Sequence, residues 1–93
     1  MKEEIFLANH KSAEKRARQS EKRRIRNAST RSRVKTAVKA TLRSVEEKDA
    51  ENSREVLRGT TKTIAKAAAR GIFHKKTAAR KISRLTKKVN ALG

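Results

Sequence analysis

The sequence predicts an all-α protein: a three-helix bundle with a long, projecting basic first helix. Three observations support this prediction. The 93 residues include no Pro, only three Gly and abundant Ala, Lys, Arg and Glu, a composition that favours helix throughout. Strand signals are missing, because no stretch alternates between apolar and polar residues and no Asn-Gly or Asp-Gly turn occurs. Apolar residues recur at helical spacing in three separate stretches.

The first helix is expected over residues 9–45, after a short N-terminal extension, residues 1–8. The second half of this helix has an apolar face made of Val34, Val38, Leu42 and Val45. Continued toward the N-terminus, the same face carries only Ser20, Arg24, Asn27 and Arg31. The apolar stripe therefore stops partway along the helix.

Residues 11–33, here called the arm, have almost nothing to bury. They include ten basic residues and two Glu, and Ile25 is the only apolar side chain larger than Ala. We therefore expect the arm to project from the bundle over roughly 35 Å, at about 1.5 Å per residue. Because basic residues occur on most sides of this helix, the arm can touch phosphates on two strands at once.

The second helix is expected over residues 50–70 and the third over residues 75–90. Asp49 can cap the second helix, and Gly71 suits the left-handed position after its end. The second helix has a face made of Val56, Leu57, Thr60, Ile64, Ala67 and Ala68. The third has one made of Ala78, Ile82, Leu85, Val89 and Leu92. Three short apolar stripes predict one small bundle, with residues 1–93 as a single domain.

The charge is large, one-signed and unevenly placed. Twenty-seven Lys and Arg against nine Asp and Glu give a net charge of +18, which predicts a polyanionic partner. The third helix carries a basic row opposite its apolar face, made of Lys76, Arg80, Lys81, Arg84, Lys87 and Lys88. The turn between the first two helices gathers five acids: Glu46, Glu47, Asp49, Glu51 and Glu55. That end is expected to face away from the polyanion.

The composition also argues against several functions. Leu, Ile, Val and Phe make up only 17 of the residues, too few for a large core with a deep enzyme pocket. The absence of Cys removes thiol catalysis and Cys-ligated zinc, and His10 and His74 lack metal-ligand spacing. No nucleophile–base pair can be proposed. We expect no enzyme activity, no catalytic residue, no metal, no cofactor and no small-molecule substrate.

The residue types limit how a polyanion can be recognised. Phe6 and Phe73 are the only aromatic residues, too few for the stacking platforms that bind single strands. Arg and Lys on rigid helices suit double-helical RNA read by its backbone shape, or duplex DNA. The residues therefore leave two alternatives, an RNA-binding protein and a chromosome-associated DNA-compacting protein. No apolar run is long enough for a membrane span, and the chain lacks the basic start of a secretory signal, so a cytoplasmic location is expected.

Two stretches of the sequence are distinctive. One is ANHKSAEKRARQSEKRR over residues 8–24, continued by Arg26-Asn27-Ala28-Ser29 and Arg31-Ser32. The other is GIFHKKTAARK over residues 71–81, continued by Ser83-Arg84-Leu85. Both resemble the bacterial small-subunit ribosomal protein S20 family, the second at that family's turn into its last helix. The resemblance covers about residues 8–93, and residues 1–7 have no counterpart in it.

The resemblance implies a three-helix protein that binds small-subunit ribosomal RNA directly, bridges RNA helices and aids subunit assembly as part of the ribosome. It implies RNA contacts in the arm by Lys11, Ser12, Lys15, Arg16, Arg18, Ser20, Lys22, Arg23, Arg24, Arg26, Asn27, Arg31 and Arg33. It implies further contacts by His74, Lys75, Lys76, Arg80, Lys81 and Arg84. The basic row of the third helix adds Lys87 and Lys88 as candidates. We expect no membrane contact and no homo-oligomer.

Overall fold

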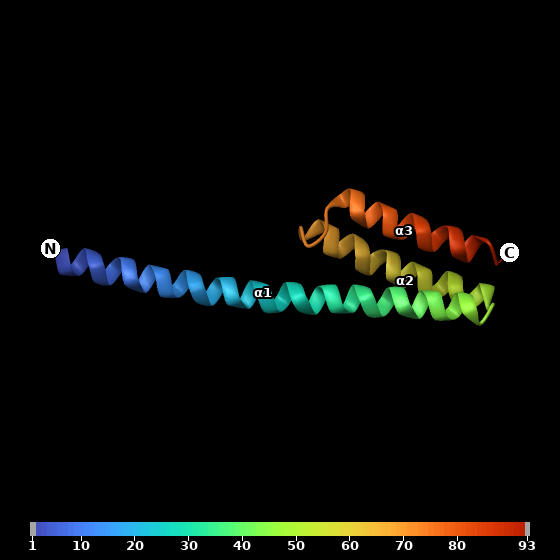
Figure 1. Ribbon diagram of the computed structural model, residues 1–93, viewed down its shortest axis with the longest axis horizontal. Coiled ribbons are helices and arrows are strands. Elements are labelled where there is room, and N and C mark those ends of the chain that lie inside the picture. Colours follow the sequence, from blue (N-terminus) through green and yellow to red (C-terminus); the bar gives the residue numbers. More distant parts are fainter. Residues whose placement is uncertain (1, 93) are drawn as a thin grey trace.

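The computed structural model describes residues 2–92, with side chains from residue 7 onward. This part of the chain contains three α-helices and no strand: α1 (Lys2–Glu46), α2 (Ala50–Ala69) and α3 (Lys75–Asn90). Figure 1 shows α2 running back along the second half of α1 and α3 reversing direction again, while the first half of α1 extends alone. The predicted all-α fold with a long first helix is confirmed.

The length of α1 determines the shape of the molecule. Its 45 residues span about 67 Å at 1.5 Å per residue, close to the longest extent of 73 Å. The radius of gyration is 20.2 Å, well above the roughly 12 Å of a compact chain of this size. The predicted start at residue 9 was wrong, because α1 begins at Lys2. Residues 2–8 contain neither Gly nor Pro, so nothing in them stops the helix.

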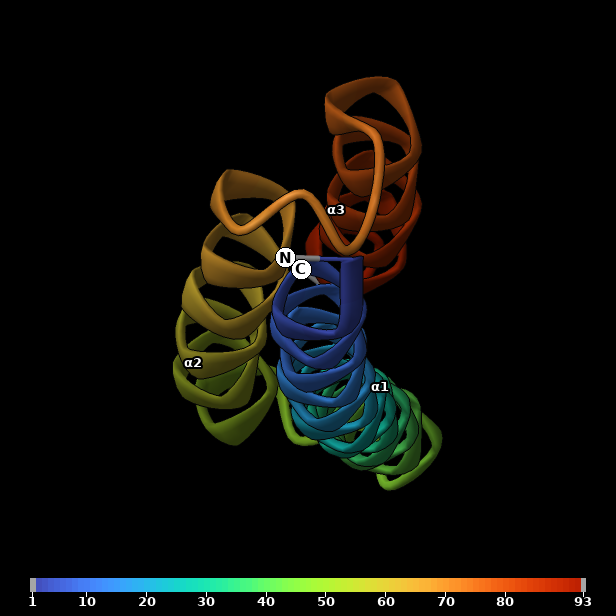
Figure 2. The ribbon, with the colours of Figure 1, turned by 90° about the vertical axis from the view of Figure 1, so that its left-hand side faces the viewer.

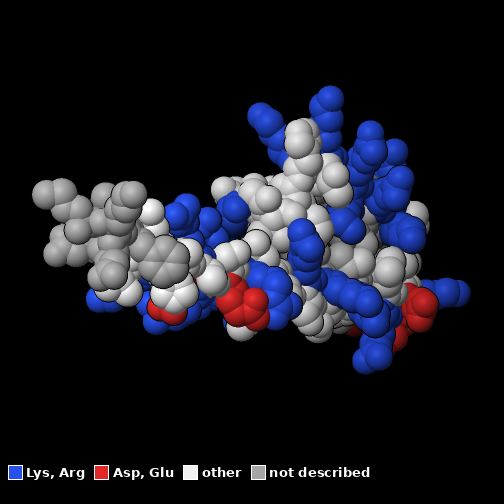
Figure 3. All heavy atoms as spheres, turned by 60° about the vertical axis from the view of Figure 1, so that its left-hand side comes forward, with Lys and Arg blue, Asp and Glu red and all other residues white. Residues whose placement is uncertain are grey.

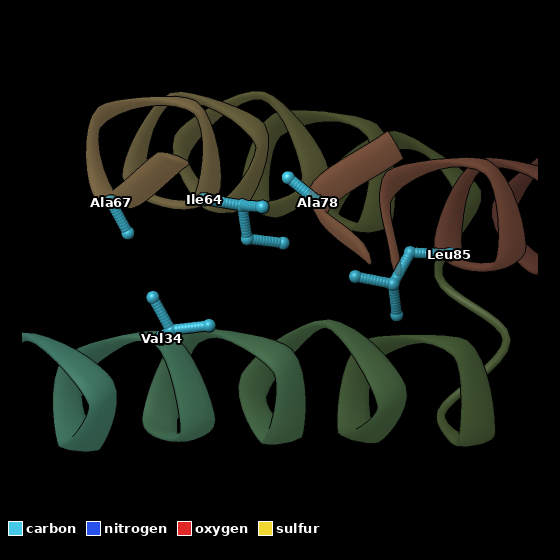
Figure 4. Close-up of a cluster of buried hydrophobic side chains, with 5 residues drawn as sticks. All are labelled: Val34, Ile64, Ala67, Ala78 and Leu85. Atoms are coloured by element: carbon cyan, nitrogen blue, oxygen red, sulfur yellow. The ribbon is translucent and has the colours of Figure 1, made fainter. Parts of the chain in front are cut away.

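A small apolar core holds the three helices together. Val34 of α1, Ile64 and Ala67 of α2, and Ala78 and Leu85 of α3 are buried and form one cluster, shown in Figure 4. Seen along α1 in Figure 2, the three helices lie at the corners of a triangle. The core is surrounded by partly buried apolar side chains, namely Val38, Leu42, Leu57, Ala68, Ile72, Phe73 and Ile82.

The packed face of α1 includes the predicted Val34, with Val38 and Leu42 against the core, but it extends to a side that the sequence did not predict. Thr41 and Ser44 are buried, whereas Val38, Leu42 and Val45 are only half-buried. Small hydroxyl side chains let α1 and α2 approach closely, and the larger Val38 and Leu42 then lie in the groove toward α3. Toward the N-terminus the predicted face continues through exposed residues, namely Ser20, Arg24, Asn27 and Arg31, so the apolar stripe ends there.

Hydrogen bonds between hydroxyl groups set the position of α2 along α1. The Oγ1 atoms of Thr41 and Thr60 are 2.8 Å apart. Both also lie within hydrogen-bond distance of the carbonyl oxygen of Ala37, Thr41 at 3.0 Å and Thr60 at 3.1 Å. Nearer the turn, the side-chain amide of Asn52 donates to Ser44 Oγ at 3.3 Å. Buried polar groups that are bonded in this way favour one alignment of the two helices. That alignment decides which residues of α2 come to lie beside the arm.

The first turn uses the cap that the sequence predicted. The side chain of Asp49 accepts a hydrogen bond from the backbone N–H of Asn52 at 3.1 Å, as an N-cap residue does. Lys48, just before it, has a positive φ of 58°. This left-handed residue reverses the chain between α1 and α2.

The second turn contains a glycine in the left-handed conformation, also as predicted. Gly71 has a φ of 77°, and its N–H donates to the carbonyl of Ala68 at 3.0 Å. The next N–H, of Ile72, donates to the carbonyl of Ala67 at 3.0 Å. This pair of bonds is the Schellman arrangement, which folds the chain back over the last turn of the helix. It brings Arg70 and Ile72 to the side of α2 that faces the arm.

Candidate nucleic-acid interface

The arm is exposed along nearly its whole length. Every residue from 11 to 33 is exposed except Thr30, which is half-buried, so every arm residue predicted to contact RNA is accessible. Even Ile25 leaves 57% of its surface open. Figure 3 shows Lys and Arg side chains along the arm with few acidic ones between them. This segment can contact a polyanion on several sides.

One cation of the arm is already engaged by a carboxylate. Arg24 Nη2 donates to Glu21 Oε1 at 2.6 Å, and Arg24 Nε donates to Glu21 Oε2 at 3.0 Å. These bonds lower the pKa of Glu21 and raise the pKa of Arg24. Arg24 is therefore a weaker candidate for a phosphate contact than its neighbours. Glu14, the second acid of the arm, pairs with His10 at 3.1 Å.

The outer face of α3 forms a second basic surface, visible along the upper edge of Figure 3. Arg80, Arg84 and Lys87 border a shallow hollow of about 360 Å³ together with Ala79 and Ser83. Lys75, Lys76 and Lys88 are exposed as well. The predicted contacts of this region, which we call the α3 ridge, are therefore exposed, except for the half-buried Lys81.

His74 and Lys81 also have contacts within the fold. Lys81 is half-buried, and its Nζ lies 5.6 Å from the centroid of the Phe73 ring, a cation–π arrangement. The Nδ1 atom of His74 accepts a hydrogen bond from the backbone N–H of Lys76 at 3.2 Å, so His74 is the N-cap of α3. This cap is not evident from the sequence, because Ser, Thr, Asp and Asn are the usual residues at that position.

The structure also brings together a group of residues that the sequence analysis did not predict as one site. A hollow of about 540 Å³ separates the arm from the turn between α2 and α3. It is lined by Arg23, Arg26, Asn27, Thr30, Arg70 and Ile72. A second hollow of about 220 Å³ adjoins it at Thr30 and Arg70. Its other lining residues are Arg33, Thr63, Lys66 and Ala67. We call the two together the corner hollow.

A simple geometric signal could have located Arg70 in advance. Antiparallel helices rise equally, about 1.5 Å per residue, so a chain that reverses near residue 48 brings residue 70 level with about residue 26. Arg70 and Lys66 are the cations missed by sequence reasoning, and Thr30 and Thr63 are the missed hydroxyl groups. Each lies within the accessible part of the interface.

Five of the nine acidic residues lie at the opposite end of the bundle from the arm. All five of the acids expected near the first turn, residues 46–55, are exposed. Glu51 and Glu55 share a hollow of about 350 Å³ with Arg54 and Arg58, a mixed-sign surface unlike the arm. These exposed acids are thus gathered at one end of the bundle, whereas the arm, the corner hollow and the outer face of α3 are basic.

The described residues contain neither a metal-binding cluster nor a membrane-spanning helix. Among the side chains of residues 7–92, no group of three or more His, Cys, Asp or Glu is placed to hold a metal ion. Over the same residues, no helix combines the length and apolar character that crossing a bilayer requires. The candidate functional site therefore consists of the basic surfaces of the arm, the corner hollow and α3.

Comparison with known proteins agrees with the resemblance seen in the motifs. The family model of ribosomal protein S20 matches residues 8–90. "Small ribosomal subunit protein bS20" of Syntrophus aciditrophicus is 59% identical over 85 residues, which cover 91% of this chain and 96% of that protein. The protein of the same name from Desulfotalea psychrophila is 54% identical over 92% of this chain and 97% of its own length. The one from Bacillus cytotoxicus is 49% identical over 91% and 100%, respectively. Since both the family model and these relatives cover nearly the whole chain, it belongs to the ribosomal protein S20 family.

Proposed function

We propose that this chain is a structural component of the small ribosomal subunit that binds small-subunit ribosomal RNA directly and aids subunit assembly. The observation that carries the proposal is the exposed arm, a helix with ten cations, two acids and no buried apolar stripe. Membership of the ribosomal protein S20 family favours RNA over DNA as the polyanion. We place the protein in the cytoplasm, within the ribosome, as a binding component and not as an enzyme.

The proposed mechanism is electrostatic bridging. Neighbouring RNA helices repel each other through their phosphates, and a cationic rod between them lowers that repulsion. Arg and Lys on different sides of the arm allow it to neutralise two backbones at once, while the α3 ridge meets a third surface. Each neutralised phosphate steepens the salt dependence of binding by about 0.7–0.9 in logarithmic slope.

We assign the strongest contacts to exposed cations without a carboxylate partner, such as Lys15, Arg16 and Arg18 of the arm and Arg80 and Arg84 of α3. Arg24, His74 and Lys81 contribute less in this proposal, because each already has a partner within the chain. No homo-oligomer is needed, since one copy presents both basic surfaces.

The test is a comparison of affinities with the full chain and three probes. These are a transcript of small-subunit ribosomal RNA, a transcript of large-subunit ribosomal RNA, and random-sequence duplex DNA, all at about 0.2 M salt to suppress non-specific binding. We expect the small-subunit transcript to bind at least about a hundredfold more tightly than either competitor. Equal affinity for the two RNAs would overturn the proposal. Tighter binding to DNA would support a DNA-compacting protein.

A further inference from the structure

The corner hollow concentrates positive charge that nothing in the fold neutralises. Its lining contains five cations from two separate elements, Arg23, Arg26, Arg33, Lys66 and Arg70, and no acidic residue. None of the five forms an ion pair among the residues that the structure describes. Like charges held around one small space repel each other, and an anion placed between them relieves that repulsion. The hollow is therefore electrostatically suited to several phosphates at once.

The hollow also offers hydrogen-bond acceptors. Thr30 Oγ1 donates its single hydrogen to the carbonyl of Arg26 at 3.0 Å, and Thr63 Oγ1 donates its own to the carbonyl of Gly59 at 3.0 Å. With those hydrogens committed, each hydroxyl oxygen can only accept a bond from a ligand. A phosphate diester has no hydrogen to donate, but a ribose 2′-hydroxyl does. Donors and acceptors side by side fit a ribonucleotide better than a deoxyribonucleotide.

The second turn removes an obstacle to anion binding. The C-terminal end of a helix is normally negative because its last carbonyl groups are unpaired. Here three backbone N–H groups of the turn, residues 70–72, donate to the carbonyls of Lys66, Ala68 and Ala67, respectively. The end of α2 therefore presents Arg70 to the hollow with these carbonyl groups already paired. Ile72 adds a small apolar surface on which a sugar ring can rest.

Building on the proposed function, we propose that the corner hollow recognises a sharply turned segment of ribosomal RNA backbone. Converging phosphates bind the guanidinium groups of Arg23, Arg26 and Arg70, and a ribose 2′-hydroxyl donates to Thr30. A straight duplex presents its phosphates along smooth rows that a single helix face can meet. A hollow bounded by two elements suits phosphates that converge where the backbone turns. The arm then supplies general affinity, and the corner hollow supplies preference for folded RNA.

The first test removes the charge of Arg70. We expect Arg70 to determine specificity for folded RNA. Affinities are measured for the small-subunit transcript and for random-sequence duplex RNA, and their ratio is the readout. We expect Arg70→Gln to weaken binding to the transcript about tenfold or more, and binding to the duplex only about two- to threefold. Arg58→Gln is the matched control, since Arg58 is exposed on the same helix but lies outside the hollow. It should leave the ratio unchanged.

The second test isolates the hydroxyl. Thr30→Val keeps the branched shape and removes the acceptor. Binding is measured for small-subunit RNA fragments that each carry a single 2′-deoxy substitution. At one position the substitution should weaken binding of the wild-type chain about three- to tenfold. The same substitution should leave binding of Thr30→Val unchanged. Circular dichroism checks that each variant retains its helices.

The outcomes separate the two proposals. If the wild-type chain prefers the small-subunit transcript and Arg70→Gln keeps the same ratio, the corner hollow is not a recognition site, although the proposed function stands. The hydroxyl contact is overturned if the Thr30→Val chain responds to every 2′-deoxy substitution as the wild type does. A wild-type chain without any preference between the RNAs would overturn the proposed function and the recognition site together.

Discussion

The two parts of α1 are one continuous helix, yet they meet very different surroundings. In the part that packs in the bundle, Val34 is 2% exposed and Thr41 is fully buried. In the arm, Ile25 is 57% exposed and the cations face solvent. The same backbone conformation is therefore supported by burial in one region and not in the other. Helical periodicity of apolar residues identifies the first kind of helix, whereas its absence together with one-signed charge identifies the second.

This contrast implies that stability and RNA affinity are separable properties of the chain. The bundle contains the apolar core, so substitutions there should change folding. An isolated helix in water is marginally stable, and the mutual repulsion of the cations in the arm lowers its helix stability further. A bound polyanion removes that repulsion. Substitutions in the arm should therefore change binding and leave unfolding of the bundle almost unaffected.

The largest effect is expected from neutralising the outer arm. Replacing Lys15, Arg16, Arg18 and Lys22 together by Gln removes four potential phosphate contacts from a region with no tertiary packing. At about 0.1 M salt the loss of counterion release predicts roughly a thousandfold weaker RNA binding, and a salt-dependence slope smaller by about 3. Fluorescence anisotropy over a salt titration measures both quantities.

The control for this variant is thermal unfolding of the bundle. The four substitutions should leave its midpoint almost unchanged. A large drop in that midpoint would show that the arm takes part in folding of the bundle.

A smaller effect, on folding instead of binding, is expected from the core. Ile64 is fully buried among side chains of all three helices, so Ile64→Ala leaves a cavity at the centre of the cluster. We expect a loss of about 3 kcal/mol in the free energy of unfolding, a large share of the roughly 5–14 kcal/mol typical for a chain of this length. Urea unfolding followed by circular dichroism measures it. An unchanged unfolding free energy would mean that this cluster does not hold the bundle together.

Much of the fold followed from local signals in the sequence. Asp49 and Gly71 were predicted at the two turns because each residue type meets a specific backbone need, and both have that role in the structure. The apolar faces of α2 and α3 were predicted from their spacing, and their central residues Ile64 and Leu85 are buried. The family was recognised from two motifs and is confirmed by the comparisons.

The remaining features depend on how the helices pair, which periodicity alone does not encode. The packed face of α1 turned out to include Thr41 and Ser44, because close contact with α2 favours small hydroxyl groups over the larger Val and Leu. The corner hollow depends on the same pairing, since only the alignment of α2 on α1 brings Arg70 beside Arg26. Helix propensity indicates which segments are helical, but long-range contacts determine which faces of the helices pack against each other.

The smallest predicted effect tests whether an acid within the arm restrains it. Glu21→Gln releases Arg24 from its two hydrogen bonds, and we expect RNA binding about two- to fivefold tighter, with a salt-dependence slope larger by about 0.7–0.9. Glu14→Gln is the matched control, because it removes the same charge without releasing an arginine. It should leave the slope unchanged, and equal slopes for the two variants would rule out a new phosphate contact by Arg24.

The same pair predicts a pH dependence with a definite sign. Because Arg24 lowers the pKa of Glu21, the carboxylate is charged at neutral pH and its bond to Arg24 is present there. The bond is lost only as the pH falls through that lowered pKa, where protonation does what the Glu21→Gln substitution does. The affinity difference between the wild-type chain and Glu21→Gln should therefore be largest near neutral pH and shrink below the pKa of Glu21. A difference that persists after protonation would have to come from a source other than the released arginine.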